Sequence, residues 1–243
     1  MKHIYAVQSQ QALTMYSSVS QRMLPKLEEF LVLLHSTYHV TSQPRCIVWT
    51  DMETATELIS NIPIPAYTND YRTVFCPELD VWKEIYLRQL ESFENREVRE
   101  YYETHLTENH VLQILGHEFV HHSEFFPDCD RESGIWFEEG MCEYISRKFF
   151  LTDSEFQEEA RINALLVSLF QEKYGQHPLE EFGSATYDGD YASIFYEYWR
   201  SFLAVQAIVE AHQGDVIEVL QKYRQWLACT DNQSLAQFFR VEI

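Results

Sequence analysis

Residues 116–122 read Gly116-His117-Glu118-Phe119-Val120-His121-His122. This heptapeptide lies in a run whose apolar residues recur at spacings of three and four, which predicts an α-helix. The apolar residues of the run are Val111, Leu112, Leu115, Phe119 and Val120. Thr107 is suited to cap the start of this helix, and the run stops before Pro127. Because residues four apart lie one above the other on a helix, we expect His117 and His121 to share one face.

Two imidazoles on one helical face can hold a single metal ion, and the His117–His121 pentapeptide is an HExxH motif, the signature of the zincin metallopeptidases. Glu118 would face the open side of such a metal, where it can take a proton from a water molecule. The motif has only three fixed positions and also occurs by chance. A third ligand is therefore needed to support a zinc site.

Catalytic zinc takes three protein ligands, so the chain should supply one more His, Glu or Asp. Residues 134–144 predict a second helix after a turn-rich loop, and an antiparallel return would set it beside the first. Within it, the Trp136-x-x-Glu139-Gly140 arrangement resembles the third-ligand segment of gluzincin metallopeptidases, above all the aminopeptidase N family. The resemblance implies that Glu139 is the third zinc ligand.

Seventeen residues separate His121 from Glu139, one fewer than is usual in that family, so the joining turn should differ. Glu138 is the competing ligand, although its side chain would point about 100° away on the helix. We prefer Glu139, which shares a stripe with Trp136. Cys142 is interpreted as a core residue rather than a ligand.

The same resemblance implies two further roles. Glu143, one turn beyond Glu139, would accept a hydrogen bond from a ligating imidazole. In the aminopeptidase N family a tyrosine opens a long helix that ends at a glycine, and the spacing from Tyr198 to Gly214 is similar. Tyr198 is therefore the expected donor to the oxyanion that forms during peptide hydrolysis, and Tyr191 is the second choice.

The rest of the chain predicts an α+β, zincin-like fold. We expect a mixed α/β N-terminal lobe with a small sheet (1–105), a mainly helical lobe (106–243) and an active-site cleft between them. The expected front-half elements are a helix over 12–38 with Pro25 at a start or kink, a strand over 45–50, a helix opened by a Thr50-to-Glu53 capping box, and a strand over 72–76. We interpret the 72–76 strand as the edge strand that aligns an extended substrate, although an interior strand fits its residues equally well.

In the back half, helices are expected over residues 154–174, 190–213 and 215–228, with a short helical turn at 238–239. Gly175 should end the first of them, and Asp215 should cap the third.

Charge and composition exclude several partners. The chain has 18 Lys and Arg against 38 Asp and Glu, and the net charge of −20 disfavours nucleic acid and anionic membranes. No run of 18 apolar residues occurs, and the start of the chain lacks the apolar core of a secretion signal. Five cysteines without a CxxC pair suit reduced thiols. We therefore expect a cytoplasmic protein.

The sequence thus predicts a Zn²⁺-dependent metallopeptidase that acts on a peptide or protein substrate. It carries no Gly-x-Met-Glu-Asn segment of the kind that anchors a substrate amino terminus, so exopeptidase action is not implied. One alternative is a zincin-like regulatory or binding protein that keeps zinc but has little turnover. Another is a helical protein in which HExxH is coincidence. The oligomeric state is not indicated.

Overall fold

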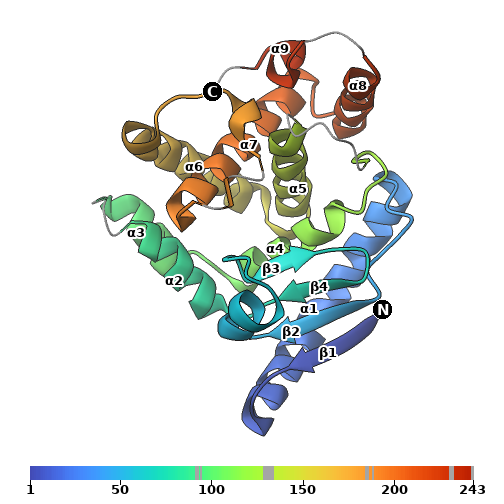
Figure 1. Ribbon diagram of the computed structural model, residues 1–243, viewed down its shortest axis with the longest axis vertical. Helices are drawn as coiled ribbons and strands as arrows, with labels where there is room; N and C mark the ends of the chain where they lie inside the picture. Colours follow the sequence, from blue (N-terminus) through green and yellow to red (C-terminus); the bar gives the residue numbers. More distant parts are fainter. Residues whose placement is uncertain are drawn as a thin grey trace. The chain divides into compact units, whose positions relative to one another are not determined.

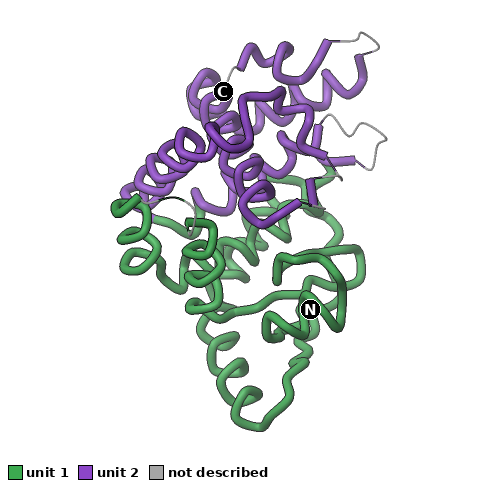
Figure 2. The backbone as a smooth tube through the Cα atoms, turned by 60° about the vertical axis from the view of Figure 1, so that its left-hand side comes forward, with its two compact units in different colours: residues 1–124, 149–151 green, residues 125–148, 152–243 purple. Residues whose placement is uncertain are grey.

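A computed structural model describes residues 1–90, 93, 95–127, 134–183, 186, 187, 189–229 and 233–241. The chain forms two compact units, residues 1–124 with 149–151 and residues 125–148 with 152–243, coloured separately in Figure 2. Helices and one small mixed sheet make up the structure, so the predicted α+β class is confirmed. The predicted lobes, 1–105 and 106–243, and the cleft between them stay predictions.

The first unit contains a four-stranded sheet in the order β1-β2-β4-β3 (Figure 1). The strands are β1 (Lys2–Ala6), β2 (Cys46–Thr50), β3 (Ala66–Thr68) and β4 (Arg72–Phe75). β1, β2 and β4 run parallel, with Ile4 opposite Val48 and Val48 opposite Val74, while β3 pairs antiparallel with β4. The strand predicted over 45–50 is confirmed, whereas β1 and β3 were not predicted.

The expectation that 72–76 is an edge strand is wrong. β4 has β2 on one side and β3 on the other, so the sheet edges are β1 and β3. The physical reason is burial on both faces, since Thr73, Val74 and Phe75 are each fully buried. A run buried on both faces suits the interior of a sheet.

The first unit also contains a long helix, α1 (Gln10–Thr37), which packs against β1, β2 and a later helix, α4. Ser9 caps its start, with the Ala12 amide donating to Ser9 Oγ at 3.1 Å. The predicted helix is confirmed, but Pro25 lies inside it and marks neither end. Its buried face includes Leu27, Phe30 and Leu34, as its periodicity predicts.

The turn after β2 differs from the prediction. Asp51, rather than Thr50, is the capping residue, because Asp51 Oδ1 accepts from the Thr54 amide at 2.8 Å. The Thr50 hydroxyl instead donates to the Ala6 carbonyl of β1 at 2.6 Å, since Thr50 still belongs to the sheet. The helix that follows is the π-helical turn η1 (Thr54–Ile59).

Three helices complete the first unit, and they are α2 (Leu79–Gln89), α3 (Arg96–Thr104) and α4 (Glu108–Val120). α4 carries the HExxH motif and packs against α1, α2 and β3. The space around α4 is tight at Gly116, where an added Cβ would meet the rings of Phe150 and Phe30.

The second unit is helical. Its elements are α5 (Ile135–Phe150, whose last two residues join the first unit), α6 (Asp153–Tyr174), η3 (Leu179–Glu181), α7 (Tyr191–Ala211), α8 (Val216–Ala228) and α9 (Leu235–Phe239). The helices predicted in this half are confirmed. Gly175 ends α6 with a φ of +78°, and Asp215 caps α8 by accepting from the Glu218 amide at 2.9 Å. Residues 128–133 of the turn-rich loop predicted before α5 lie outside the described residues.

Within the second unit, α5 and α7 come into close contact at Gly140. A Cβ added there would meet the Ser201 carbonyl oxygen and lie 2.8 Å from Val205 Cγ2. The glycine of the Trp-x-x-Glu-Gly arrangement therefore lets the backbone of α7 approach the residue that follows Glu139. Among the described residues, no helix is long and apolar enough to cross a bilayer.

Candidate metal centre

The histidine pair of HExxH lies in the first unit, at the C-terminal end of α4, with His117 in its last turn and His121 directly after it. Thr107 precedes α4 as predicted and forms a capping box with His110, whose Nδ1 accepts from the Thr107 amide at 3.1 Å. His117 is buried, and His121, which follows the last helical residue, is partly exposed. Their Nε2 atoms are 3.1 Å apart, and the ring planes are inclined by 69°. The structure thus brings these two predicted residues together.

The separation of the two nitrogens fits a shared zinc ion. With Zn–N bonds of about 2.0–2.1 Å, a distance of 3.1 Å corresponds to an N–Zn–N angle of about 100°, near the tetrahedral value. The same distance also suits a hydrogen bond between the imidazoles of a metal-free chain. The two nitrogens are thus close enough for one zinc ion to contact both.

Glu118 lies between the two histidines in sequence, His122 follows them after the end of α4, and the two side chains differ in their surroundings. Glu118 is buried, at 8% exposure. His122 Nε2 lies 2.9 Å from Thr68 Oγ1 on the edge strand β3. Burial lowers the pKa of His122, and the charge of His121 lowers it further, whereas Asp70 raises it. His122 therefore links β3 to the end of α4, a contact that sequence reasoning missed.

Glu139, the predicted third ligand, lies on α5 in the second unit and is 8% exposed. Its Oε1 accepts a hydrogen bond from the Tyr187 hydroxyl at 3.0 Å. Glu138, the competing ligand, is only partly buried. Cys142 is fully buried, and its interpretation as a core residue rather than a ligand stays a prediction. Because Glu139 and the histidines belong to different units, a ligand role for Glu139 stays a prediction.

Tyr198, the predicted oxyanion donor, lies in the same unit as Glu139. Its hydroxyl oxygen is 2.9 Å from that of Tyr187. Tyr198 does not open α7, because the helix begins at Tyr191, two turns earlier. Asp190 sets that start by accepting from the Ser193 amide at 2.8 Å. Tyr191, the second choice, is thus the residue at the helix start.

The electrostatics at the start of α7 favour an ionised Asp190. Burial raises the pKa of Asp190, but hydrogen bonds from the Ser193 amide, the Tyr174 hydroxyl and the Lys173 ammonium outweigh it. The pKa of Asp190 therefore lies below its usual value. A charged carboxylate at this position also interacts favourably with the N-terminus of the helix.

Glu143 pairs with an arginine that the sequence analysis did not single out. Arg147 Nη2 lies 2.6 Å from Glu143 Oε2, and Arg147 Nη1 lies 3.6 Å from Glu159 on α6. The guanidinium group also stacks 4.2 Å from the centre of the Phe202 ring on α7. The i, i+4 spacing of Glu143 and Arg147 was the available sequence signal. The predicted hydrogen bond from an imidazole to Glu143 stays a prediction.

Paired imidazoles on the HExxH helix are an arrangement that zinc-dependent peptidases use. The comparison with protein families agrees, because the Collagenase family model matches residues 91–238, more than half of the chain. The chain therefore belongs to the collagenase family, a family of zinc metallopeptidases that hydrolyse peptide bonds. No curated protein and no solved structure matches the chain.

Proposed function

We propose that the chain is a gluzincin-type peptidase whose zinc ion is held by His117, His121 and Glu139. The observation that carries the proposal is the 3.1 Å separation of the two Nε2 atoms on α4. Glu139 is a better third ligand than Glu138, because its carboxylate is buried and accepts a hydrogen bond. Glu143, one turn further along α5, is proposed to orient one of the imidazoles by accepting its N–H.

Glu118 is the proposed general base. Zn²⁺ bound at this site would polarise the scissile carbonyl and lower the pKa of a water molecule. The Glu118 carboxylate would take a proton from the attacking water and deliver it to the leaving amine. Tyr198 is proposed to donate a hydrogen bond to the carbonyl oxygen as negative charge develops there.

The proposed substrate is a peptide or an unfolded protein segment in an extended conformation. An extended chain can add to an exposed sheet edge through its main chain, with side-chain pockets giving specificity. β3 replaces the 72–76 segment in this role, because β3 is an edge of the sheet and is linked to α4 through Thr68 and His122. The family's description makes gelatin a suitable first protein substrate to assay.

We also propose that the protein acts in the cytoplasm. Among the described residues, Cys46, Cys76, Cys142 and Cys229 form no disulfide, which supports a reducing compartment. The net charge of −20 supports a partner that is neither nucleic acid nor an anionic membrane.

The proposal is tested with wild-type protein and the Glu118→Gln variant, each analysed for zinc and for cleavage of a peptide library. The variant should bind one zinc per chain and cleave about 10²–10⁴-fold more slowly, because the amide cannot accept the proton and general base catalysis contributes a factor of this size. Equal cleavage by both proteins would remove Glu118 from the mechanism. A wild-type protein without zinc, even after reconstitution, would overturn the metal site itself.

The alternative is a zincin-like regulatory or binding protein with a bound zinc and little turnover. The same experiment separates it from the peptidase. Stoichiometric zinc in the wild-type protein, together with no cleavage of any library peptide or of gelatin, would favour the alternative.

A further inference from the structure

Tyr187 makes a hydrogen bond to Glu139, yet no sequence motif singles Tyr187 out. It lies between α6 and α7, in the same unit as Glu139 on α5 and Tyr198 on α7. The Tyr187 hydroxyl is 3.0 Å from Glu139 Oε1 and 2.9 Å from the Tyr198 hydroxyl. Three residues that are distant in sequence thus form one chain of hydrogen bonds.

The direction of these hydrogen bonds follows from the number of protons. An ionised carboxylate only accepts, so the single phenolic proton of Tyr187 is donated to Glu139. Until a substrate carbonyl oxygen takes this role, the hydroxyl of Tyr198 must donate to the oxygen of Tyr187. Tyr187 therefore holds one carboxylate oxygen of Glu139 in place, and the hydroxyl of Tyr198 in turn holds the hydroxyl of Tyr187.

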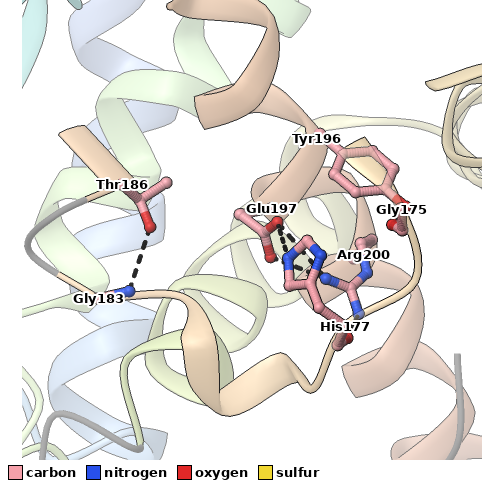
Figure 3. Close-up of polar contacts among 7 residues, drawn as sticks. All are labelled: Gly175, His177, Gly183, Thr186, Tyr196, Glu197 and Arg200. Atoms are coloured by element: carbon pink, nitrogen blue, oxygen red, sulfur yellow. Dashed lines mark hydrogen bonds and ion pairs between the residues drawn. The ribbon is translucent and has the colours of Figure 1, made fainter. Parts of the chain in front are cut away.

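The segment that carries Tyr187 is attached at its beginning to α7, the helix that carries Tyr198 (Figure 3). The Tyr196 hydroxyl donates to the Gly175 carbonyl at 2.9 Å, and the Arg200 guanidinium donates to the His177 carbonyl. His177 Nε2 lies 2.7 Å from Glu197 Oε1. Glu197 and Arg200 are 5% and 1% exposed and pair with each other at 3.1 Å, so the α7 side of this attachment is buried.

Two further contacts hold the segment close to Tyr187. Phe182 is fully buried, and its ring centre lies 5.4 Å from that of Tyr198 and 6.1 Å from that of Tyr187. The Gly183 amide donates to Thr186 Oγ1 at 3.2 Å, one residue before Tyr187 (Figure 3). The ring of Tyr187 is thus held by packing, independently of its hydroxyl.

We propose that Tyr187 is a positioning residue that orients the Glu139 carboxylate for zinc, and that it acts with Tyr198 as a pair. This inference rests on the proposed ligand role of Glu139. A hydrogen bond to one carboxylate oxygen orients the carboxylate before the metal binds. The carboxylate therefore loses less conformational freedom when it binds the metal. Groups that orient a ligand in this way contribute about 10–100-fold to metal affinity.

The test is the Tyr187→Phe variant, which removes the hydroxyl and keeps the ring that packs on Phe182. The zinc affinity of the purified full-length chain is measured by competition with a chromogenic chelator, without any turnover. We expect a 10–100-fold weaker affinity. Tyr174→Phe is the matched control, because Tyr174 also donates to a carboxylate, that of Asp190 at 2.8 Å, and its variant should bind zinc like the wild type.

Glu139→Gln separates this inference from the proposed function. If Glu139→Gln binds zinc as tightly as the wild type, the ligand role of Glu139 fails, and the proposed function fails with it. If Glu139→Gln weakens zinc binding but Tyr187→Phe does not, only the inference is overturned.

A double variant then distinguishes positioning of Glu139 from a general structural effect. If Tyr187 acts through Glu139, adding Tyr187→Phe to Glu139→Gln should not weaken zinc binding further. Full additivity of the two losses would show that Tyr187 acts elsewhere and would overturn the inference. Far-UV circular dichroism melts of all variants establish that each one is folded.

Discussion

Replacement of Gly140 by alanine tests the close contact between α5 and α7. The new Cβ would meet the Ser201 carbonyl oxygen and lie 2.8 Å from Val205 Cγ2. Backbone cannot rotate away as a side-chain end can, so α7 would have to move away from α5. Overpacking of this kind costs about 1–3 kcal/mol, and contact with backbone places Gly140→Ala at the upper end of that range.

A gain in helix propensity opposes this cost. Alanine is more favourable than glycine inside a helix by about 0.8–1.0 kcal/mol. The steric term is larger, so the expected net loss in the free energy of unfolding is about 2 kcal/mol. For a chain of this size that loss corresponds to a decrease of about 4–8 °C in Tm.

Urea unfolding followed by circular dichroism measures the difference, and Gly116→Ala is the control. Gly116 is also inside a helix, but its added Cβ would meet the side-chain rings of Phe150 and Phe30 rather than backbone atoms. Gly116→Ala should therefore lose less stability than Gly140→Ala. A Gly140→Ala protein as stable as the wild type would show that α7 does not approach α5 closely.

Two further predictions concern charged groups of the second unit. Arg147→Met should lower the free energy of unfolding by about 3–5 kcal/mol in urea titrations, because it leaves the buried carboxylates of Glu143 and Glu159 without their cation, and Arg147→Lys should recover part of the loss. Asp190→Asn should lower the free energy of unfolding at neutral pH. The pKa of Asp190 is lower in the folded chain than in the unfolded chain, so its carboxylate stabilises the fold at pH values above the pKa that Asp190 has when unfolded. That difference should disappear as the pH falls through the lowered pKa. A difference that stays constant down to pH 2 would mean that the Asp190 charge is not responsible.

The parts of the fold that sequence patterns predicted are those governed by local contacts. α4 follows from apolar residues at helical spacing and from Thr107 at its start. The end of α6 follows from Gly175, which adopts a positive φ, and the start of α8 follows from Asp215. Each of these patterns depends on residues that are no more than four positions apart. The local sequence therefore contains the information needed to predict these helices and their ends.

The sheet was predicted poorly because its contacts are not local. β1 is a short, partly exposed strand, and it is defined by pairing with β2 about forty residues later, where Lys2 lies opposite Cys46. The interior place of β4 depends on β2 and β3 together. Thr50 looked like a helix cap, but its hydroxyl bonds to Ala6 in a strand that the sequence did not reveal.

The sequence by itself determined that His117 and His121 lie on one face, because an α-helix of 3.6 residues per turn places residues four apart together whatever surrounds them. Only the tertiary structure decided which tyrosine contacts Glu139. Tyr187 is 48 positions away, and the contact depends on where α7 and the segment before it pack against α5. That packing depends on the space that Gly140 leaves open and on the buried attachment to α7, and neither property belongs to a single stretch of sequence.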